Sequence, residues 1–184
     1  MHSLEADDAR LLREIARRCI VCLARGISMS MTGWEMRQVP VIDEEIARWT
    51  LDQPPELAAV RAALQRVLSE RLQKSTVDLD DLAERLLIVA TELAGNALRH
   101  AQPPTVVALL RADGHLIVDV IDNQPGTEPV ADSHRRPGEG GLGLPLAEHL
   151  AEDVGWFPAD GRKHVWAQFT IPSAGTGASS TSFR

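Results

Sequence analysis

The stretch Leu82–His100 reads LAERLLIVATELAGNALRH and predicts the buried central helix of the fold. Its apolar side chains recur at spacings of three and four residues, which places them on one stripe of an α-helix. Neighbouring apolar residues widen this stripe so far that the helix has to be covered on more than one side. The apolar positions are Leu82, Leu86, Leu87, Ile88, Val89, Ala90, Leu93 and Ala97.

Glu92 and Asn96 are polar side chains within this apolar helix. They stand one turn apart and therefore point in the same direction, with Arg99 close to the same face. Burying an unpaired carboxylate costs on the order of several kcal/mol, so we expect Glu92 to face a hydrated cleft, a partner or a metal-bearing ligand. Carboxylate and amide oxygens suit Mg²⁺, which usually arrives with nucleotide phosphates. Taken alone, an E-x-x-x-N pattern more often lies on a solvated helix face, so a functional interpretation of Glu92 and Asn96 depends on the motifs in the rest of the chain.

Length and charge narrow the classes of protein to consider. A chain of 184 residues is expected to form one domain with a substantial core. It carries 19 Lys and Arg against 26 Asp and Glu, a net charge of -7, and has no basic stripe, so no direct contact with nucleic acid is expected. No apolar run is long enough to span a membrane, and the acidic start MHSLEADDAR is unlike a signal peptide. We therefore expect a cytoplasmic protein without a membrane partner.

Residues 1–45 are assigned to an N-terminal extension that contains an amphipathic helix pattern at residues 8–25. This helix is expected to pack either on the domain or on a second copy of the chain, which would form a homodimer. Cys19 and Cys22 lie on its apolar side, spaced C-x-x-C. Because no second cysteine pair and no suitably spaced histidines follow, core cysteines are favoured over a zinc or redox site.

The following part, residues 46–172, predicts one domain, and the tail at residues 173–184 has the composition of a disordered segment. Helical and strand patterns alternate along the domain, and Asp80 or Asp81 is expected to cap the central helix. The predicted elements are a strand at 45–51, a helix at 54–73, the central helix, a hairpin of strands at 105–111 and 115–121, a helix ended by Gly155, and a strand at 163–171. This order argues for an α+β fold, a two-layer sandwich with helices on one face of a mostly antiparallel sheet.

Asp122 and a glycine-rich loop supply further candidate binding groups. Asp122 ends the second hairpin strand, and the turn DNQPG leaves its carboxylate at the edge of the sheet. GEGGLGL, at 138–144, satisfies G-x-G-x-x-G, but no buried strand precedes it and no Lys-Ser/Thr follows, so Rossmann and Walker A loops are both rejected. Closely spaced glycines at a helix start do let backbone N–H groups approach phosphates. The preceding stretch 127–137 has the composition of a mobile loop.

The ordered set ELAGNALRH, IDNQPG, GEGGLGL and KHVWAQF resembles the Bergerat-fold ATPases, the superfamily of gyrase, histidine kinases and mismatch-repair ATPases. It is most similar to the small stand-alone branch, the anti-sigma-factor serine kinases and their actinobacterial relatives. The resemblance covers about Arg48 to Pro172. It implies a Bergerat ATP-binding fold with ATP and Mg²⁺ as cofactors.

The resemblance also implies a role for each motif residue. Glu92 matches the acidic residue that orients or activates a nucleophile, Asn96 matches the ligand of Mg²⁺ and the phosphates, and Asp122 would accept the adenine amino group. Gly126 would let the chain pass beside the base. Phosphate contacts are expected from Gly138, Gly140, Gly141, Gly143, Arg135 and Arg136. The family pattern D-x-G-x-G is broken at Gln124, whose bulk is expected to weaken the base pocket.

Two functions follow as hypotheses from this resemblance. The first is a serine/threonine protein kinase that sequesters a sigma factor and phosphorylates a small anti-anti-sigma partner. The alternative is a nucleotide-gated binding module that sequesters the sigma factor without phosphoryl transfer, which the Gln124 departure keeps open. A two-component histidine kinase is disfavoured, because no helical hairpin with a phospho-acceptor histidine precedes the domain.

Overall fold

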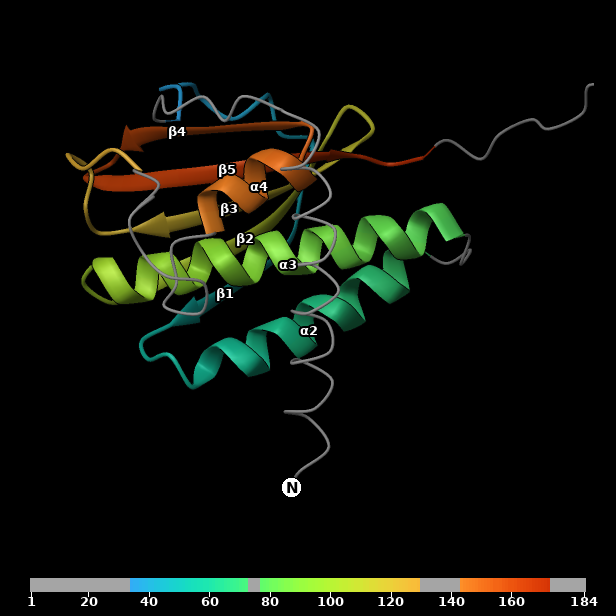
Figure 1. Cartoon of the computed structure of the whole chain (residues 1–184), viewed down its shortest axis with the longest axis horizontal. Helices are drawn as coiled ribbons and strands as arrows, with labels where there is room; N and C mark the ends of the chain where they lie inside the picture. The colour runs from blue at the N-terminus through green and yellow to red at the C-terminus, as the bar shows by residue number, and fades with distance from the viewer. Residues whose placement is uncertain (1–33, 73–76, 130–142, 173–184) are drawn as a thin grey trace, which may run out of the picture. The chain divides into compact units, whose positions relative to one another are not determined.

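The computed structural model describes residues 34–72, 77–129 and 143–172, which belong to one compact unit that begins at Gly33 (Figure 1). Several predictions from the sequence lie outside these ranges. They concern the amphipathic helix with its two cysteines, the loop at 130–142 and the C-terminal tail.

The described residues form a five-stranded antiparallel sheet with helices beside it. The strands are β1 (Glu44–Leu51), β2 (Thr105–Ala112), β3 (His115–Asp122), β4 (Asp153–Ala159) and β5 (Arg162–Thr170), in the order β1-β2-β3-β5-β4. The helices are α2 (Glu56–Arg71), α3 (Val77–His100) and α4 (Gly143–Leu150). Figure 1 shows all three helices in front of the sheet, so the predicted α+β sandwich with helices on one face is confirmed.

The main core lies between α3 and the sheet. Val118 and Val120 of β3 alternate with side chains of the other face and join a buried cluster with the leucine stripe of α3. Each fully buried leucine contributes about 1.5–3 kcal/mol, so this stripe is a main source of stability. The α3 members with almost no exposed surface are Leu82, Leu86, Val89 and Leu93. The central helix is therefore the element that the apolar pattern predicted.

Residues 34–43 run along the edge of the sheet and onto its second face. Met36 forms a parallel bridge with Trp156 of β4, and the Arg37 N–H donates to the carbonyl oxygen of Trp156 at 2.8 Å. Val39 and Ile42 then pack against a smaller apolar cluster that contains Trp166. A segment that the sequence placed in the N-terminal extension thus covers part of the sheet.

The strand β4 was not predicted. The sequence suggested one helix continuing to Gly155, but α4 ends at Leu150 and residues 153–159 pair with β5. Gly155 is needed here because an added Cβ would lie 2.8 Å from Cζ2 of Trp166 on the neighbouring strand. Pro158 fits because β4 is an edge strand of the five, where a missing N–H donor is tolerated. The helical prediction was therefore wrong beyond residue 150.

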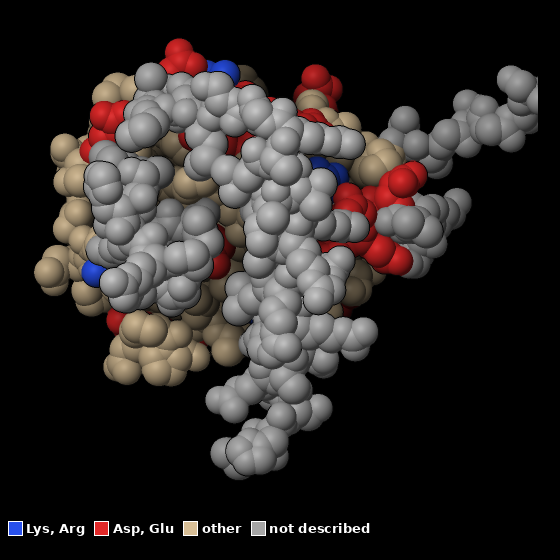
Figure 2. Space-filling view, in the orientation of Figure 1, with Lys and Arg blue, Asp and Glu red and all other residues tan. Residues whose placement is uncertain are grey.

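The predicted cap of α3 was also wrong. The helix begins at Val77, so Asp80 and Asp81 lie inside it. Asp78 and Asp80 occupy the first turn, where negative charge interacts favourably with the helix dipole. Figure 2 shows acidic side chains gathered toward the end of the helical layer where α3 begins. Within the described ranges, no helix has the length and apolar character needed to cross a membrane.

Candidate functional site

Glu92 is a half-buried carboxylate on the C-terminal half of α3. Removal from water raises the pKa of the Glu92 carboxyl, while the positive charge of Arg99 acts in the opposite direction. A carboxyl with a raised pKa holds a proton more readily than an exposed one. A carboxyl group of this kind is suited to exchange a proton with a bound molecule.

Asn96 stands one turn after Glu92 and contacts Arg99 directly. Nη2 of Arg99 donates to Oδ1 of Asn96 at 2.6 Å. Gly95 makes room for this arrangement, since an added Cβ would lie 3.3 Å from Nη1 of Arg99 and 3.8 Å from Cδ2 of Leu57 on α2. A glycine weakens a helix by about 1 kcal/mol relative to alanine, and at this position it leaves space beside the end of the Arg99 side chain.

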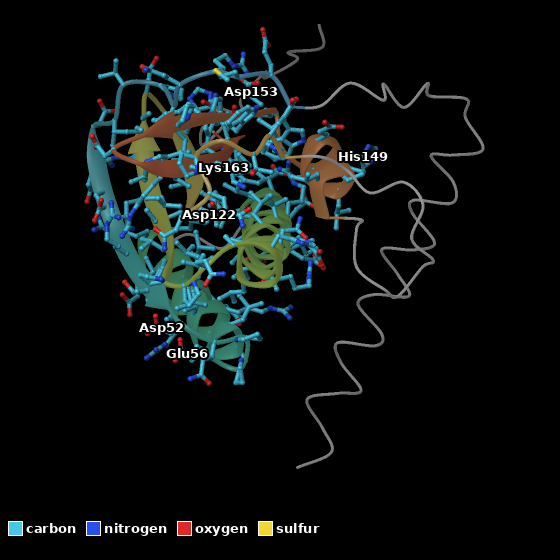
Figure 3. All side chains as sticks on the ribbon, turned by 90° about the vertical axis from the view of Figure 1, so that its left-hand side faces the viewer. Asp52, Glu56, Asp122, His149, Asp153 and Lys163 are labelled. Carbon is cyan, nitrogen blue, oxygen red and sulfur yellow. The ribbon has the colours of Figure 1, made fainter. Side chains whose placement is uncertain are left out.

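Asp122 is buried at the end of β3, with 2% of its surface exposed. Its Oδ1 accepts the backbone N–H of Gln124 at 2.8 Å, which closes the turn after the strand. Its Oδ2 lies 3.0 Å from Nζ of Lys163, the residue directly opposite on β5. The side chains of Asp122 and Lys163, which are labelled in Figure 3, lie between the sheet and the helices. Both carboxylate oxygens are therefore engaged within the protein.

Lys163 was not among the residues identified from the sequence. It is 8% exposed and lies on the same face of β5 as Val165 and Ala167, which belong to the core beneath the helices. The alternation in KHVWAQFTI was a usable signal, because it placed a lysine on the buried face of a strand. The partner could not be read in the same way, because pairing with Asp122 depends on the register between β3 and β5.

The end of β3 is tied to the connection that follows α3. Nδ2 of Asn123 donates to the carbonyl oxygens of Gln102 at 3.0 Å and of Pro104 at 3.3 Å. Gln102 comes two residues after the end of α3, and Pro104 comes directly before β2. The fold therefore holds Asp122 and the C-terminal half of α3 at the same end of the sheet.

The two described glycines of the predicted site differ in what can be said of them. An added Cβ at Gly126 would meet no heavy atom within 4 Å, so nothing among its described surroundings requires a glycine there. Gly143 is the first residue of α4, so the helix that was predicted to follow the glycine loop begins within the last residues of that loop. The remaining predicted phosphate contacts, Gly138, Gly140, Gly141, Arg135 and Arg136, lie outside the described residues.

The chemistry of the α3 face suits a hard cation held jointly with a ligand. Among the residues that the structure describes, no three His, Cys, Asp or Glu side chains group together as a metal site. Asn96 offers an amide oxygen that already attracts the guanidinium of Arg99, and Glu92 offers a carboxylate nearby on the helix. A Mg²⁺ ion bound here would take its other oxygen ligands from water and phosphates.

A family model described as histidine kinase-like ATPase domain matches residues 53–169. No curated protein sequence matches the chain. Among solved structures, the RsbU and RsbW domains of Rv1364c from Mycobacterium tuberculosis are similar at 20% sequence identity and a TM-score of 0.47. That match covers 67% of this chain and 32% of the other, so the chain spans about a third of that structure's length.

Proposed function

The chain belongs to the histidine kinase-like ATPase domain family, and on this premise we propose that it binds ATP with Mg²⁺ and transfers the γ-phosphate to a serine or threonine hydroxyl. The observation that carries the proposal is the face of α3 on which a half-buried Glu92 with a raised pKa precedes Asn96 by one turn. Phosphoryl transfer requires a proton acceptor for the attacking hydroxyl and a metal ligand close to it, and this face offers one of each.

Glu92 is the proposed base. As the hydroxyl oxygen bonds to the γ-phosphorus, the bond from that phosphorus to the β–γ bridging oxygen breaks, and the hydroxyl proton passes to the Glu92 carboxylate. Asn96 would hold Mg²⁺ through its amide oxygen, and the bound ion would supply positive charge that offsets the charge of the phosphates. Asp122, buried at the same end of the sheet, accepts the adenine amino group. In this scheme the protein mainly positions groups and stabilises charge.

The proposed partners are a sigma factor and a small anti-anti-sigma protein that carries the acceptor hydroxyl. Support comes from the motif order in the sequence, which resembles the stand-alone anti-sigma-factor kinases. The alternative is a nucleotide-gated module that sequesters the sigma factor without transfer, and it rests on Gln124 replacing a glycine of the family pattern.

Titration calorimetry with the full chain tests nucleotide binding first. ATP and ADP are expected to bind with Mg²⁺ and to bind much more weakly in excess EDTA. Asn96→Ala should weaken binding of the Mg²⁺ complex, whereas Gln65→Ala, at an exposed position of α2, should not. Absence of both heat and a thermal shift at millimolar nucleotide with Mg²⁺ would refute the proposed function.

A second experiment separates transfer from gating. The full chain is incubated with γ-labelled ATP and candidate small partners encoded near its gene, and label on a partner serine or threonine supports the kinase. If no partner is labelled, yet ATP changes the affinity for a sigma factor, the nucleotide-gated module replaces the kinase.

A further inference from the structure

We propose that Lys163 recognises the nucleotide base. Its Nζ donates a hydrogen bond to ring nitrogen N1 of adenine, next to the amino group whose hydrogen bond Asp122 accepts. The inference rests on the proposed function and extends it, because it assigns base selection to a pair of opposite charge. Asp122 and Lys163 stand directly opposite each other at the end of β3 and β5.

The burial of Lys163 calls for an explanation. Its side chain is 10% exposed, and lysines are almost never buried to this degree without a partner. Stability alone explains the pair poorly, because replacing a buried ion pair by apolar residues is often neutral or stabilising. A buried charge pair at a predicted ligand site is better explained by what it contacts in the bound state.

Both members of the pair have bonding capacity left for a ligand. An ammonium group has three N–H donors, and among the described residues the structure gives Nζ one acceptor, Oδ2 of Asp122 at 3.0 Å. A carboxylate has about four lone-pair sites, and two of those of Asp122 are used, one on Oδ1 by the Gln124 N–H and one on Oδ2 by Lys163. The pair therefore presents an acceptor and a donor next to each other.

This arrangement of one acceptor and one donor is complementary to the edge of adenine that carries N1 and the amino group, and it is not complementary to the same edge of guanine. Adenine carries its amino donor next to N1, which is an acceptor, so the carboxylate and the ammonium are both satisfied. Guanine held in the same orientation presents a carbonyl oxygen to Asp122 and an N–H to Lys163, which puts acceptor against acceptor and donor against donor. Unpaired polar groups of this kind in a buried site discriminate strongly between ligands. Lys163 thus makes the site selective for adenine nucleotides.

Base analogues test this in the unmodified full chain with Mg²⁺. In 1-deaza-ATP a C–H replaces N1, so its dissociation constant is expected to be about 10- to 100-fold larger than that of ATP, the loss typical of a hydrogen bond to a charged group. 7-Deaza-ATP is the matched control, and it should bind like ATP because no contact to N7 is proposed. GTP should bind at least as weakly as 1-deaza-ATP.

Lys163→Met provides the complementary variant. It should bind ATP and 1-deaza-ATP with equal, reduced affinity, since the donor is gone, and circular dichroism checks that it folds. If this variant does not fold, the comparison of ATP with 1-deaza-ATP in the unmodified chain still tests the contact between Lys163 and N1. Equal binding of ATP and 1-deaza-ATP by the unmodified chain overturns the role of Lys163 and leaves the proposed function standing. If ATP itself does not bind, the proposed function fails and the inference fails with it.

Discussion

Arg99 donates to Asn96 from one turn further along α3, with Nη2 2.6 Å from Oδ1, so a side-chain cation occupies the amide oxygen that we assign to Mg²⁺. The same arginine lowers the pKa of Glu92 against the effect of burial. The positive charge of Arg99 therefore acts on both the proposed base, Glu92, and the proposed metal ligand, Asn96.

Arg99→Ala is expected to lower the Mg²⁺ concentration that supports nucleotide binding. The guanidinium and the ion compete for Asn96 Oδ1, and a hydrogen bond to a charged group contributes about 1.5–3 kcal/mol, reduced here because Arg99 is exposed. The shift should be roughly 3- to 10-fold, measured by calorimetry across a Mg²⁺ series. It should vanish in the Asn96→Ala background, and Arg66→Ala on the exposed side of α2 should show none. A weaker Mg²⁺ response after Arg99→Ala would instead make Arg99 a phosphate contact.

Glu92→Gln is expected to leave nucleotide affinity nearly unchanged and to lower phosphoryl transfer by roughly 100-fold or more, the usual scale for loss of a general base. Glutamine keeps the shape of the side chain, so the change isolates the charge. Because burial raises the pKa of Glu92, transfer by the unmodified chain should decline on acidification at a higher pH than an exposed glutamate would cause. Single-turnover assays with a verified partner measure both effects, with Glu84→Gln, exposed on the same helix, as the control. Full transfer by Glu92→Gln would assign the carboxylate a structural role.

Glu92→Gln is also expected to stabilise the fold at neutral pH. The raised pKa means that the folded state holds the Glu92 proton more tightly than the unfolded state, so the contribution of this group to stability is greatest in acid and is lost as pH rises through the folded pKa. Thermal unfolding should show a higher Tm for Glu92→Gln than for the unmodified chain at pH 7. The difference should shrink below about pH 4, where an ordinary glutamate is also protonated. A lower Tm at pH 7 would mean that Arg99 stabilises the ionised carboxylate more than burial opposes it.

The helical period of α3 and the two apolar runs of β2 and β3, which a short turn joins, were sufficient to predict the sandwich, because these features are local in the sequence. The face shared by Glu92 and Asn96 followed from the same helical period. Residues 34–43 carry no such period. Their position depends on contacts with distant residues, such as the bond from Nε1 of Trp156 to the carbonyl oxygen of Trp34 at 2.8 Å.

Pairs across the sheet were the part that could not be predicted. His164 places Nδ1 2.8 Å from Oδ2 of the buried Asp119 and stacks on Phe157 with ring centroids 4.5 Å apart. This pair, like Asp122 with Lys163, depends on the alignment of β3 with β5. A shift of one residue would turn every side chain to the other face. Registers between strands distant in sequence are set by the whole core rather than by a local motif.

Gly126→Ala is expected to weaken nucleotide binding without weakening the fold. The glycine has no positive φ, and an added Cβ would meet no atom within 4 Å, so alanine brings no strain and stabilises by up to about 1 kcal/mol through the unfolded state. If the chain passes beside the base at this point, the methyl group intrudes on the ligand. Calorimetry with Mg²⁺-ATP and urea unfolding measure the two effects separately. Unchanged affinity would remove Gly126 from the proposed site.

Gly155→Ala is expected to have the opposite effects: it should lower the stability of the fold and leave the nucleotide affinity nearly unchanged. An added Cβ would lie 2.8 Å from Cζ2 and 2.9 Å from Cε2 of Trp166, closer than real contacts allow. The indole cannot move aside easily, because Trp166 is 1% exposed and its Nε1 donates to the carbonyl oxygen of Arg37 at 2.9 Å. Overpacking of this kind costs about 1–3 kcal/mol, measured by urea unfolding followed by circular dichroism.

The control for Gly155→Ala is Gly126→Ala, where the same methyl group meets no neighbour. Trp166 faces the side of the sheet opposite to Lys163, which precedes it by three residues on β5, so the loss of stability should leave the affinity for Mg²⁺-ATP within about twofold under conditions where the variant is folded. Full stability of Gly155→Ala would show that the indole is free to shift and that residues 34–43 do not hold it in place. Lost affinity in a folded Gly155→Ala would instead show that the two faces of the sheet are coupled, since a change beneath Trp166 would then have reached the base site through β5.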